Sequence, residues 1–155
     1  MRKIILNLAV SLDGYICDDD GGFDWIVGQG NRECDSGEGF DFPQFMSSVD
    51  TVVMGSKAYE DCILSGLQTF DDQKVIVATN RNLEIENDAV FISGDICKQV
   101  VEMGKEEGEN IWLFGGAGVV DPFLKADVID EYIIRIIPTI LGHGRRLFKG
   151  DCPTI

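Results

Sequence analysis

The stretch "IWLFGGAGVV", residues 111–120, decides the fold. Its first four residues, Ile111 to Phe114, are apolar and run directly into Gly115 and Gly116, after which an apolar run resumes. A continuous apolar run of this kind is typical of a central strand that is buried on both faces. Glycines after such a strand let a ligand approach the backbone closely, and a helix start offers free N–H groups to a phosphate. The stretch therefore predicts a strand, a bare turn and a helix, and it suits either a nucleotide-phosphate site or a tight turn without a ligand.

Two further strand ends have a similar character. "VVMGSKAYE" (52–60) predicts a strand, Gly55 and a helix whose first turn contains Ser56 and Lys57. "VIVATNR" (75–81) predicts a strand that ends in Thr79, Asn80 and Arg81. In open α/β sheets, ligands bind beyond the carboxyl ends of the strands. We therefore expect these loops, with Lys57 and Arg81, to grip one extended anionic ligand.

Apolar runs alternate with helical patterns along the whole chain, and this alternation predicts the fold class. It is typical of an α/β, three-layer sandwich with a mainly parallel central sheet, here as a single domain over residues 1–155. A long loop is expected over 13–39. Strands are predicted at 3–10, 50–55, 74–79, 89–92, 111–114 and 129–141, and helices at 42–48, 56–64, 95–107 and 119–125.

The net charge of −14 narrows the function classes. It argues against nucleic acid and against an anionic membrane surface, because both require clustered Lys and Arg. If the ligand is anionic, the 13 basic residues must gather where it binds. No apolar run reaches the roughly 18 residues of a membrane span, and the first strand follows the start directly, so we expect a cytoplasmic protein. The five scattered cysteines and the single histidine predict no metal site.

Two common phosphate motifs are missing or incomplete. No G-x-x-x-x-G-K-[ST] loop occurs in the sequence. The G-x-G-x-x-G fingerprint is only half present, because Gly116 and Gly118 are followed by Asp121 where the third glycine belongs. Neither motif therefore identifies the fold.

Six segments together resemble the dihydrofolate reductase-like superfamily. The resemblance is strongest to the bacterial group akin to the C-terminal reductase domain of the riboflavin-biosynthesis deaminase-reductase. "SLDGYI" combined with "LFGGAGVV" is the specific part. The segments follow the family's order: "NLAVSLDGYI" (7–16), "GFDW" (22–25), "SVDTVVMGSKAYE" (48–60), "VIVATNR" (75–81), "IWLFGGAGVV" (111–120) and "IDEYIIRIIPTILGHGRRLF" (129–148).

The resemblance implies that NADPH is the hydride donor. Gly115 and Gly116 would be the family's strained diglycine, which a cis peptide often joins. Arg81 would bind the 2′-phosphate and favour NADPH over NADH, because a guanidinium binds phosphate in a bidentate way. The implied cofactor-binding residues are Ala9, Gly55, Ser56, Lys57, Thr79, Arg81, Gly115, Gly116, Ala117, Gly118 and Val119.

The resemblance also implies a reaction, the reduction of a ribosylamino-pyrimidine or pterin-type small molecule. Asp13 and Asp41 are the candidate catalytic acids, with Glu38 as a further candidate, although Asp13 before Gly14 is also an ordinary turn former. The family pattern M-G-R-K-T-Y has serine and alanine in place of arginine and threonine here. A non-catalytic nucleotide- or pterin-binding module is therefore the alternative.

Some expectations concern single residues and assembly. His143, Arg145 and Arg146 are expected in a solvated surface turn, and Trp112 in the core. Trp25 either caps the active-site loop or packs half-buried. Family members usually continue through a further strand or strand pair, so a homodimer that covers an open sheet edge is a hypothesis.

Overall fold

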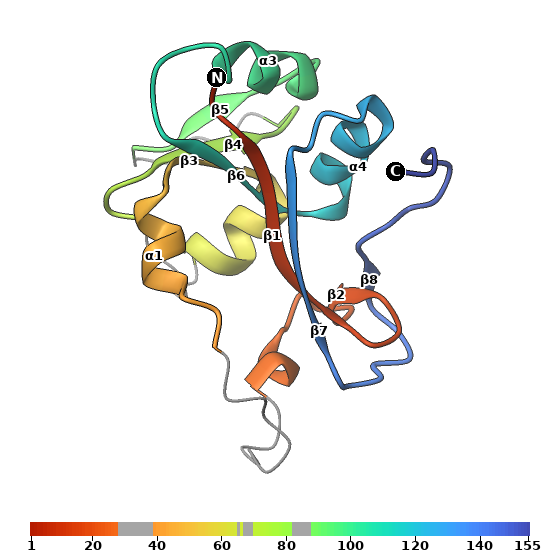
Figure 1. Ribbon diagram of the computed structural model, residues 1–155. Helices are drawn as coiled ribbons and strands as arrows, with labels where there is room; N and C mark the ends of the chain where they lie inside the picture. The colour runs from red at the N-terminus through yellow and green to blue at the C-terminus, as the bar shows by residue number, and fades with distance from the viewer. Residues whose placement is uncertain (28–38, 65, 67–69, 82–87) are drawn as a thin grey trace.

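A six-stranded parallel sheet carries the fold (Figure 1). The computed structural model describes residues 1–27, 39–64, 66, 70–81 and 88–155. The strand order is β5-β4-β3-β6-β1-β7, and every neighbouring pair is parallel. The strands are β1 (Ile4–Ser11), β3 (Val49–Gly55), β4 (Lys74–Ala78), β5 (Val90–Ile92), β6 (Asn110–Gly115) and β7 (Glu131–Ile137).

Helices cover both faces of this sheet. One face packs against α3 (Ile96–Met103) and α4 (Ala117–Ala126), which contribute Val100 and Phe123 to the core. The other face packs against α1 (Phe42–Ser47) and against α2 (Ser56–Ala58), which continues as the π-helical turn η2 (Tyr59–Leu64). The predicted three-layer α/β sandwich is confirmed.

The segment expected as one long loop contains regular structure. It holds β2 (Tyr15–Cys17) and the short helix η1 (Asp24–Val27). β2 pairs antiparallel with β8 (Arg145–Arg146), whose residues come from the expected surface turn. Strands of two or three residues are too short to show a period, so the sequence pattern missed them.

Two predicted elements are shorter than expected. The helix predicted over 95–107 ends at Met103, because Gly104 caps it. The strand predicted over 129–141 spans Glu131–Ile137 and stops before Pro138, which has no N–H for a ladder.

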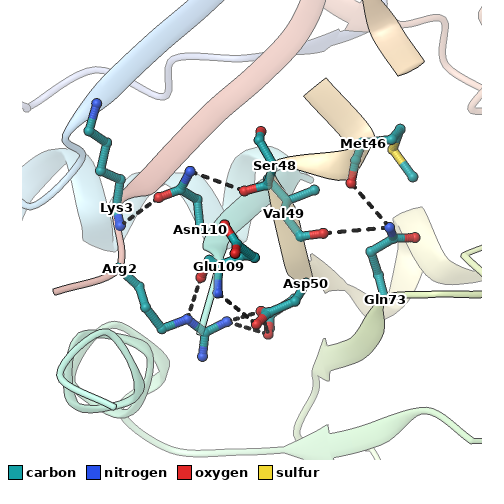
Figure 2. A network of polar contacts seen from close by, with 10 residues as sticks. Arg2, Lys3, Met46, Ser48, Val49, Asp50, Gln73, Glu109 and Asn110 are labelled. Atoms are coloured by element: carbon teal, nitrogen blue, oxygen red, sulfur yellow. Dashed lines mark hydrogen bonds and ion pairs between the residues drawn. The ribbon is translucent and has the colours of Figure 1, made fainter. Parts of the chain in front are cut away.

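A polar network ties the amino ends of β1, β3 and β6 together (Figure 2). The Arg2 guanidinium forms an ion pair with Asp50, and its Nε donates to the Glu109 carbonyl at 2.6 Å. Both polar atoms of the Asn110 amide make hydrogen bonds, because Oδ1 accepts from Lys3 N at 3.1 Å and Nδ2 donates to the Ser48 carbonyl at 3.0 Å. This edge of the sheet is therefore closed by its own side chains. Among the described helices, none is both long and apolar enough to span a membrane.

Candidate functional site

Two glycine junctions meet at the opposite, carboxyl edge of the sheet. Gly115 and Gly116 end β6 with φ values of +129° and +79°, which side chains rarely tolerate. A Cβ on Gly116 would lie 3.9 Å from Gly55 N, so the ends of β6 and β3 face one another. A Cβ on Gly55 would lie 3.2 Å from Val119 Cγ2, so that approach is also tight. The expected adjacency of these two loops is confirmed.

The peptide bond between Gly115 and Gly116 is trans, unlike the cis bond that often joins the family's diglycine. All peptide bonds of the described residues are trans. The positive φ angles of Gly115 and Gly116 accompany the turn from strand to helix instead.

A cavity of about 980 Å³ opens at this edge. Gly115 is the one predicted cofactor residue that does not line it, because it is buried beside Leu8. The structure therefore brings together ten of the eleven residues implied by the resemblance, from β1, the β3–α2 junction, the end of β4 and the start of α4. These ten are Ala9, Gly55, Ser56, Lys57, Thr79, Arg81, Gly116, Ala117, Gly118 and Val119.

The charge on the cavity wall is opposite to the charge of the chain. Asp61 is the single acidic residue among the described lining residues, although the chain has 27 acidic residues. Six of the 13 basic residues also line the cavity. The condition that the sequence set for an anionic ligand is thus met. The six are Lys57, Arg81, Arg135, Arg145, Arg146 and Lys149.

Most of these cations have no acidic partner. Arg145 Nη1 lies 2.9 Å from Asp61 Oδ2, and Arg81 forms an ion pair with Glu60. Within the described part of the chain, the other four make no ion pair with a carboxylate: Lys57, Arg135, Arg146 and Lys149.

One unpaired cation stands at the start of α4. A Cβ on Gly118 would lie 3.5 Å from the Lys149 ammonium, so this lysine reaches over the first turn of the helix. Free N–H groups and the helix dipole also favour an anion at this point. The glycine backbone and the Lys149 ammonium thus both favour an anion in this part of the cavity.

The other end of the cavity is aromatic. Phe42, Trp112 and Phe114 line it, and the Trp112 and Phe114 ring centroids are 5.1 Å apart. The Trp112 indole donates to the Asn7 carbonyl at 2.9 Å, and the residue is only 4% exposed. Trp112 is a core residue, as expected, and it also forms part of the cavity wall. These rings pack edge-to-face, and an aromatic wall of this kind suits a planar ligand.

The candidate catalytic acids lie elsewhere. Neither Asp13 nor Asp41 lines the cavity, and Glu38 is outside the described residues. The Asp13 carboxylate accepts from Ser11 Oγ at 2.7 Å and from Gly142 N at 2.8 Å. These hydrogen bonds lower the pKa of Asp13 to about 2. Its contacts support the turn-forming interpretation.

Asp41 has a local structural contact of its own. Its Oδ1 accepts from Gln44 N at 2.9 Å and caps α1. This is an ordinary role for an aspartate at a helix start. The catalytic role of both aspartates stays a prediction without support from their positions.

The expected solvated turn around 143–146 is wrong for Arg145, which is half-buried, whereas Arg146 is exposed as expected. β8 pairs with β2, which holds Arg145 against Asp61 and places the Arg146 guanidinium 4.6 Å from the Tyr15 ring centroid. His143 is exposed, and its Nδ1 lies 2.9 Å from Asp19 Oδ2. It does not line the cavity.

Sequence reasoning also missed Asn7, Arg135 and Lys149 in the cavity wall. Two of these had a readable signal. Asn7 is the only polar residue in "IILNLAV", and Arg135 is the only charge in "YIIRIIP". Asn7 is buried in β1, where a polar side chain requires a partner. Arg135 is exposed on the edge strand β7, where a single charge interrupts the apolar pattern.

Cysteine and metal chemistry have little support at this site. Cys17 and Cys62 line the cavity, and burial raises the pKa of Cys62 to about 11. The thiol therefore stays protonated at neutral pH. The described residues contain no cluster of His, Cys, Asp and Glu that suits a metal ion.

Comparisons with known proteins agree with this geometry. A family model described as the RibD C-terminal domain matches residues 2–153. Two Bacillus subtilis (strain 168) proteins, both named as uncharacterized, are similar over 95% of this chain. YwjB is 38% identical, with 83% of its own length covered, and YyaP is 32% identical, with 80% covered.

Solved structures show the same fold. A Shewanella sp. PV-4 protein named for riboflavin biosynthesis matches all of this chain and 86% of its own, with 28% identity and a TM-score of 0.79. Enterococcus faecalis dihydrofolate reductase, solved with NADP(H) and RAB-propyl, matches 99% of this chain and 78% of its own. Its identity is 18% and its TM-score 0.64, so this likeness concerns the fold alone.

Proposed function

Since this chain belongs to the family of the RibD C-terminal domain, we propose that it is an NADPH-dependent reductase of a pyrimidine- or pterin-type substrate. The observation that carries the proposal is the charge of the cavity. A chain of net charge −14 gathers six basic residues and one acidic residue around two glycine junctions. Such a wall suits a dinucleotide with several phosphates.

The chain's residues fit NADPH at the end of the cavity where the glycines lie. Gly55 and Gly116 leave room for the pyrophosphate to pass close to the backbone, and Lys57 and Lys149 supply charge without an acidic competitor. Thr79 and Arg81 would hold the adenosine end, and Arg81 would exchange Glu60 for the 2′-phosphate. When bound, NADPH supplies a hydride to a ring-opened ribosyl group or to a C=N bond.

The protein's remaining task is to hold the substrate and exclude water. Phe42, Trp112 and Phe114 would stack on a flat heterocycle and shield the reacting carbon. Reduction of a carbonyl also requires a proton for the new hydroxyl. Asp61 is engaged by Arg145, so a single bound water is the proton source we favour.

One observation favours the alternative, a binding module without turnover. The described cavity wall offers no carboxyl group that is free of an ion pair. Such a module would bind NADPH and heterocycles but would leave both unchanged.

A titration and a turnover assay separate the two functions. Tryptophan fluorescence is followed while purified protein is titrated with NADPH and, separately, NADH. Micromolar binding with a preference for NADPH is expected, followed by NADPH oxidation when the 5-amino-6-ribosylamino-pyrimidinedione 5′-phosphate is added. Binding without oxidation on any pyrimidine or pterin substrate supports the module. No binding of either dinucleotide contradicts both.

A further inference from the structure

The aromatic end of the cavity contains a buried amide whose polar atoms have no partner. Asn7 is 1% exposed, and neither its Oδ1 nor its Nδ2 makes a hydrogen bond. Its backbone carbonyl accepts a hydrogen bond from the Trp112 indole, so it is the side chain that lacks a partner. Buried amides are nearly always paired, and an exception calls for an absent partner. Because Asn7 lines the cavity, a ligand is in position to be that partner.

An asparagine side chain has a particular complement. Its amide presents one acceptor and one donor side by side in a plane. A lactam or imide edge of a heterocycle presents the same two groups in the reverse order. A ligand that satisfies both amide atoms therefore carries such an edge, whereas a hydrocarbon ring does not.

Arg135 is a charged residue that lines the same cavity as Asn7. It lies on β7 opposite Ala9 of β1, two positions beyond the residue opposite Asn7. Side chains alternate along a strand, so Asn7 lies on the face of Ile5, and Arg135 lies on the face of Ile133. Both Ile5 and Ile133 pack in the aromatic cluster that contains Trp112 and Phe114. From the strand spacing and rise, the Asn7 and Arg135 Cα atoms are roughly 8 Å apart.

The Arg135 guanidinium contacts an aromatic ring but has no carboxylate partner among the described residues. It lies 5.3 Å from the Phe40 ring centroid, and no carboxylate pairs with it in the described ranges. A guanidinium over an aromatic ring can still donate hydrogen bonds from its N–H groups to another molecule. The planar arrangement of these N–H groups matches two oxygens of a carboxylate or phosphate. The glycine end already has Lys57 and Lys149 for the cofactor, so Arg135 is available to a second anion.

We propose that Asn7 and Arg135 are the substrate-recognition pair, in which Asn7 binds the lactam edge of a planar heterocycle and Arg135 binds an anionic substituent on it. This inference rests on the proposed function for its assignment of a substrate site. It assigns two residues of this chain to the lactam edge and to the anionic substituent of such a substrate.

The test measures heterocycle binding by calorimetry without NADPH, so its outcome does not depend on cofactor binding. Two pairs of probes share a lactam or imide edge and differ only in charge. Pterin and pterin-6-carboxylate test a carboxylate, and uridine and uridine 5′-monophosphate test a phosphate. We expect the charged member of at least one pair to bind about tenfold tighter, as a charge-assisted hydrogen bond provides. The pair that shows the preference identifies the substituent.

Three variants assign the effect to residues. Arg135→Gln should reduce the preference to less than twofold and leave the affinity for the neutral member unchanged. Lys105→Gln, at an exposed cation that does not line the cavity, should keep the preference. Asn7→Leu should weaken both members of a pair by about tenfold with the preference kept, because the lactam loses its partner. Circular dichroism checks that each variant folds.

Several results would overturn the proposal. They are a preference that persists in Arg135→Gln, an Asn7→Leu affinity within threefold of wild type, or no binding of any of the four probes to the wild-type protein. Failure of the proposed function has a different signature, because NADPH would then neither bind nor be oxidised while the heterocycle affinities stood as measured.

Discussion

Replacing Asn7 by leucine should stabilise the ligand-free protein. Leucine has nearly the same shape as asparagine and has no polar atoms to leave unpaired. Leaving a buried polar group unsatisfied costs about 1–3 kcal/mol, and this is the free energy of unfolding that Asn7→Leu should add. For a chain of this size, 1 kcal/mol shifts the melting temperature by about 2–4 °C, so an increase of about 2–12 °C is expected.

Asn110→Leu is the matched control, because it makes the same chemical change at an amide whose hydrogen bonds are made. The bonds to Lys3 N and to the Ser48 carbonyl (Figure 2) would both be lost. At about 0.5–1.5 kcal/mol each, their loss should lower the free energy of unfolding by about 1–3 kcal/mol. The two variants should therefore shift the melting temperature in opposite directions.

Differential scanning calorimetry of the three proteins without ligand measures both shifts. A melting temperature that falls in Asn7→Leu as it does in Asn110→Leu would refute the reasoning, since the Asn7 amide would then be paired in the folded protein. An increase would mean that Asn7 lowers stability, as residues kept for binding often do.

Three further predictions concern the glycines, the adenosine end and the loop after β1. Gly116→Ala and Gly142→Ala place a Cβ at similar φ angles, +79° and +76°, so both should lose about 1–2 kcal/mol of stability. Only Gly116→Ala should also weaken NADPH binding, by about tenfold or more, in a fluorescence titration; equal affinities would contradict a glycine cradle. Arg81→Ala should abolish the preference for NADPH over NADH, whereas Glu60→Gln, which frees the guanidinium, should increase it, and an unchanged ratio in both would place the 2′-phosphate elsewhere. The folded-state pKa of Asp13 is depressed to about 2, so its carboxylate stabilises the fold above about pH 4 and loses this effect as the pH falls toward 2. Urea midpoints should accordingly show wild type above Asp13→Asn at pH 7 and a narrowing gap below pH 4, and a gap that is constant with pH would count against the carboxylate bonds.

The sequence predicted the glycine-lined part of the cavity better than the part that contains Asn7 and Arg135. Gly55 and Gly116 stand at the ends of apolar runs, where a residue without a side chain lets a ligand approach the backbone closely. This pattern involves neighbouring residues in the sequence, so it could be recognised without the structure. Arg135 and Asn7 were missed because each is a single polar residue inside an apolar run. Only the register between β1 and β7 shows that Asn7 and Arg135 lie on the same face of the sheet, close to one another.

Other features depend on contacts between distant segments. Arg145 and Arg146 enter the cavity because β8 pairs with β2, more than a hundred residues earlier, and neither strand has a period to read. The homodimer, the single domain and the cytoplasmic location stay predictions. Among the described strands, β7 pairs with β1 alone and forms one edge of the sheet, which is the edge that the homodimer hypothesis concerns.

The position of β1 between β6 and β7 has a consequence for synthesis on the ribosome. Ile4 at the start of β1 bonds to Asp130, 126 residues later. At about 5–20 residues per second, β1 waits roughly 6–25 s for its second neighbour to emerge. Until β6 emerges, β3, β4 and β5 are available to pair with one another, whereas the apolar "IILNLAV" segment has neither of its neighbouring strands and is open to chaperones. We expect nascent chains that stop before residue 111 to be protease-sensitive in this segment, with protection appearing only once β6 and β7 have left the exit tunnel.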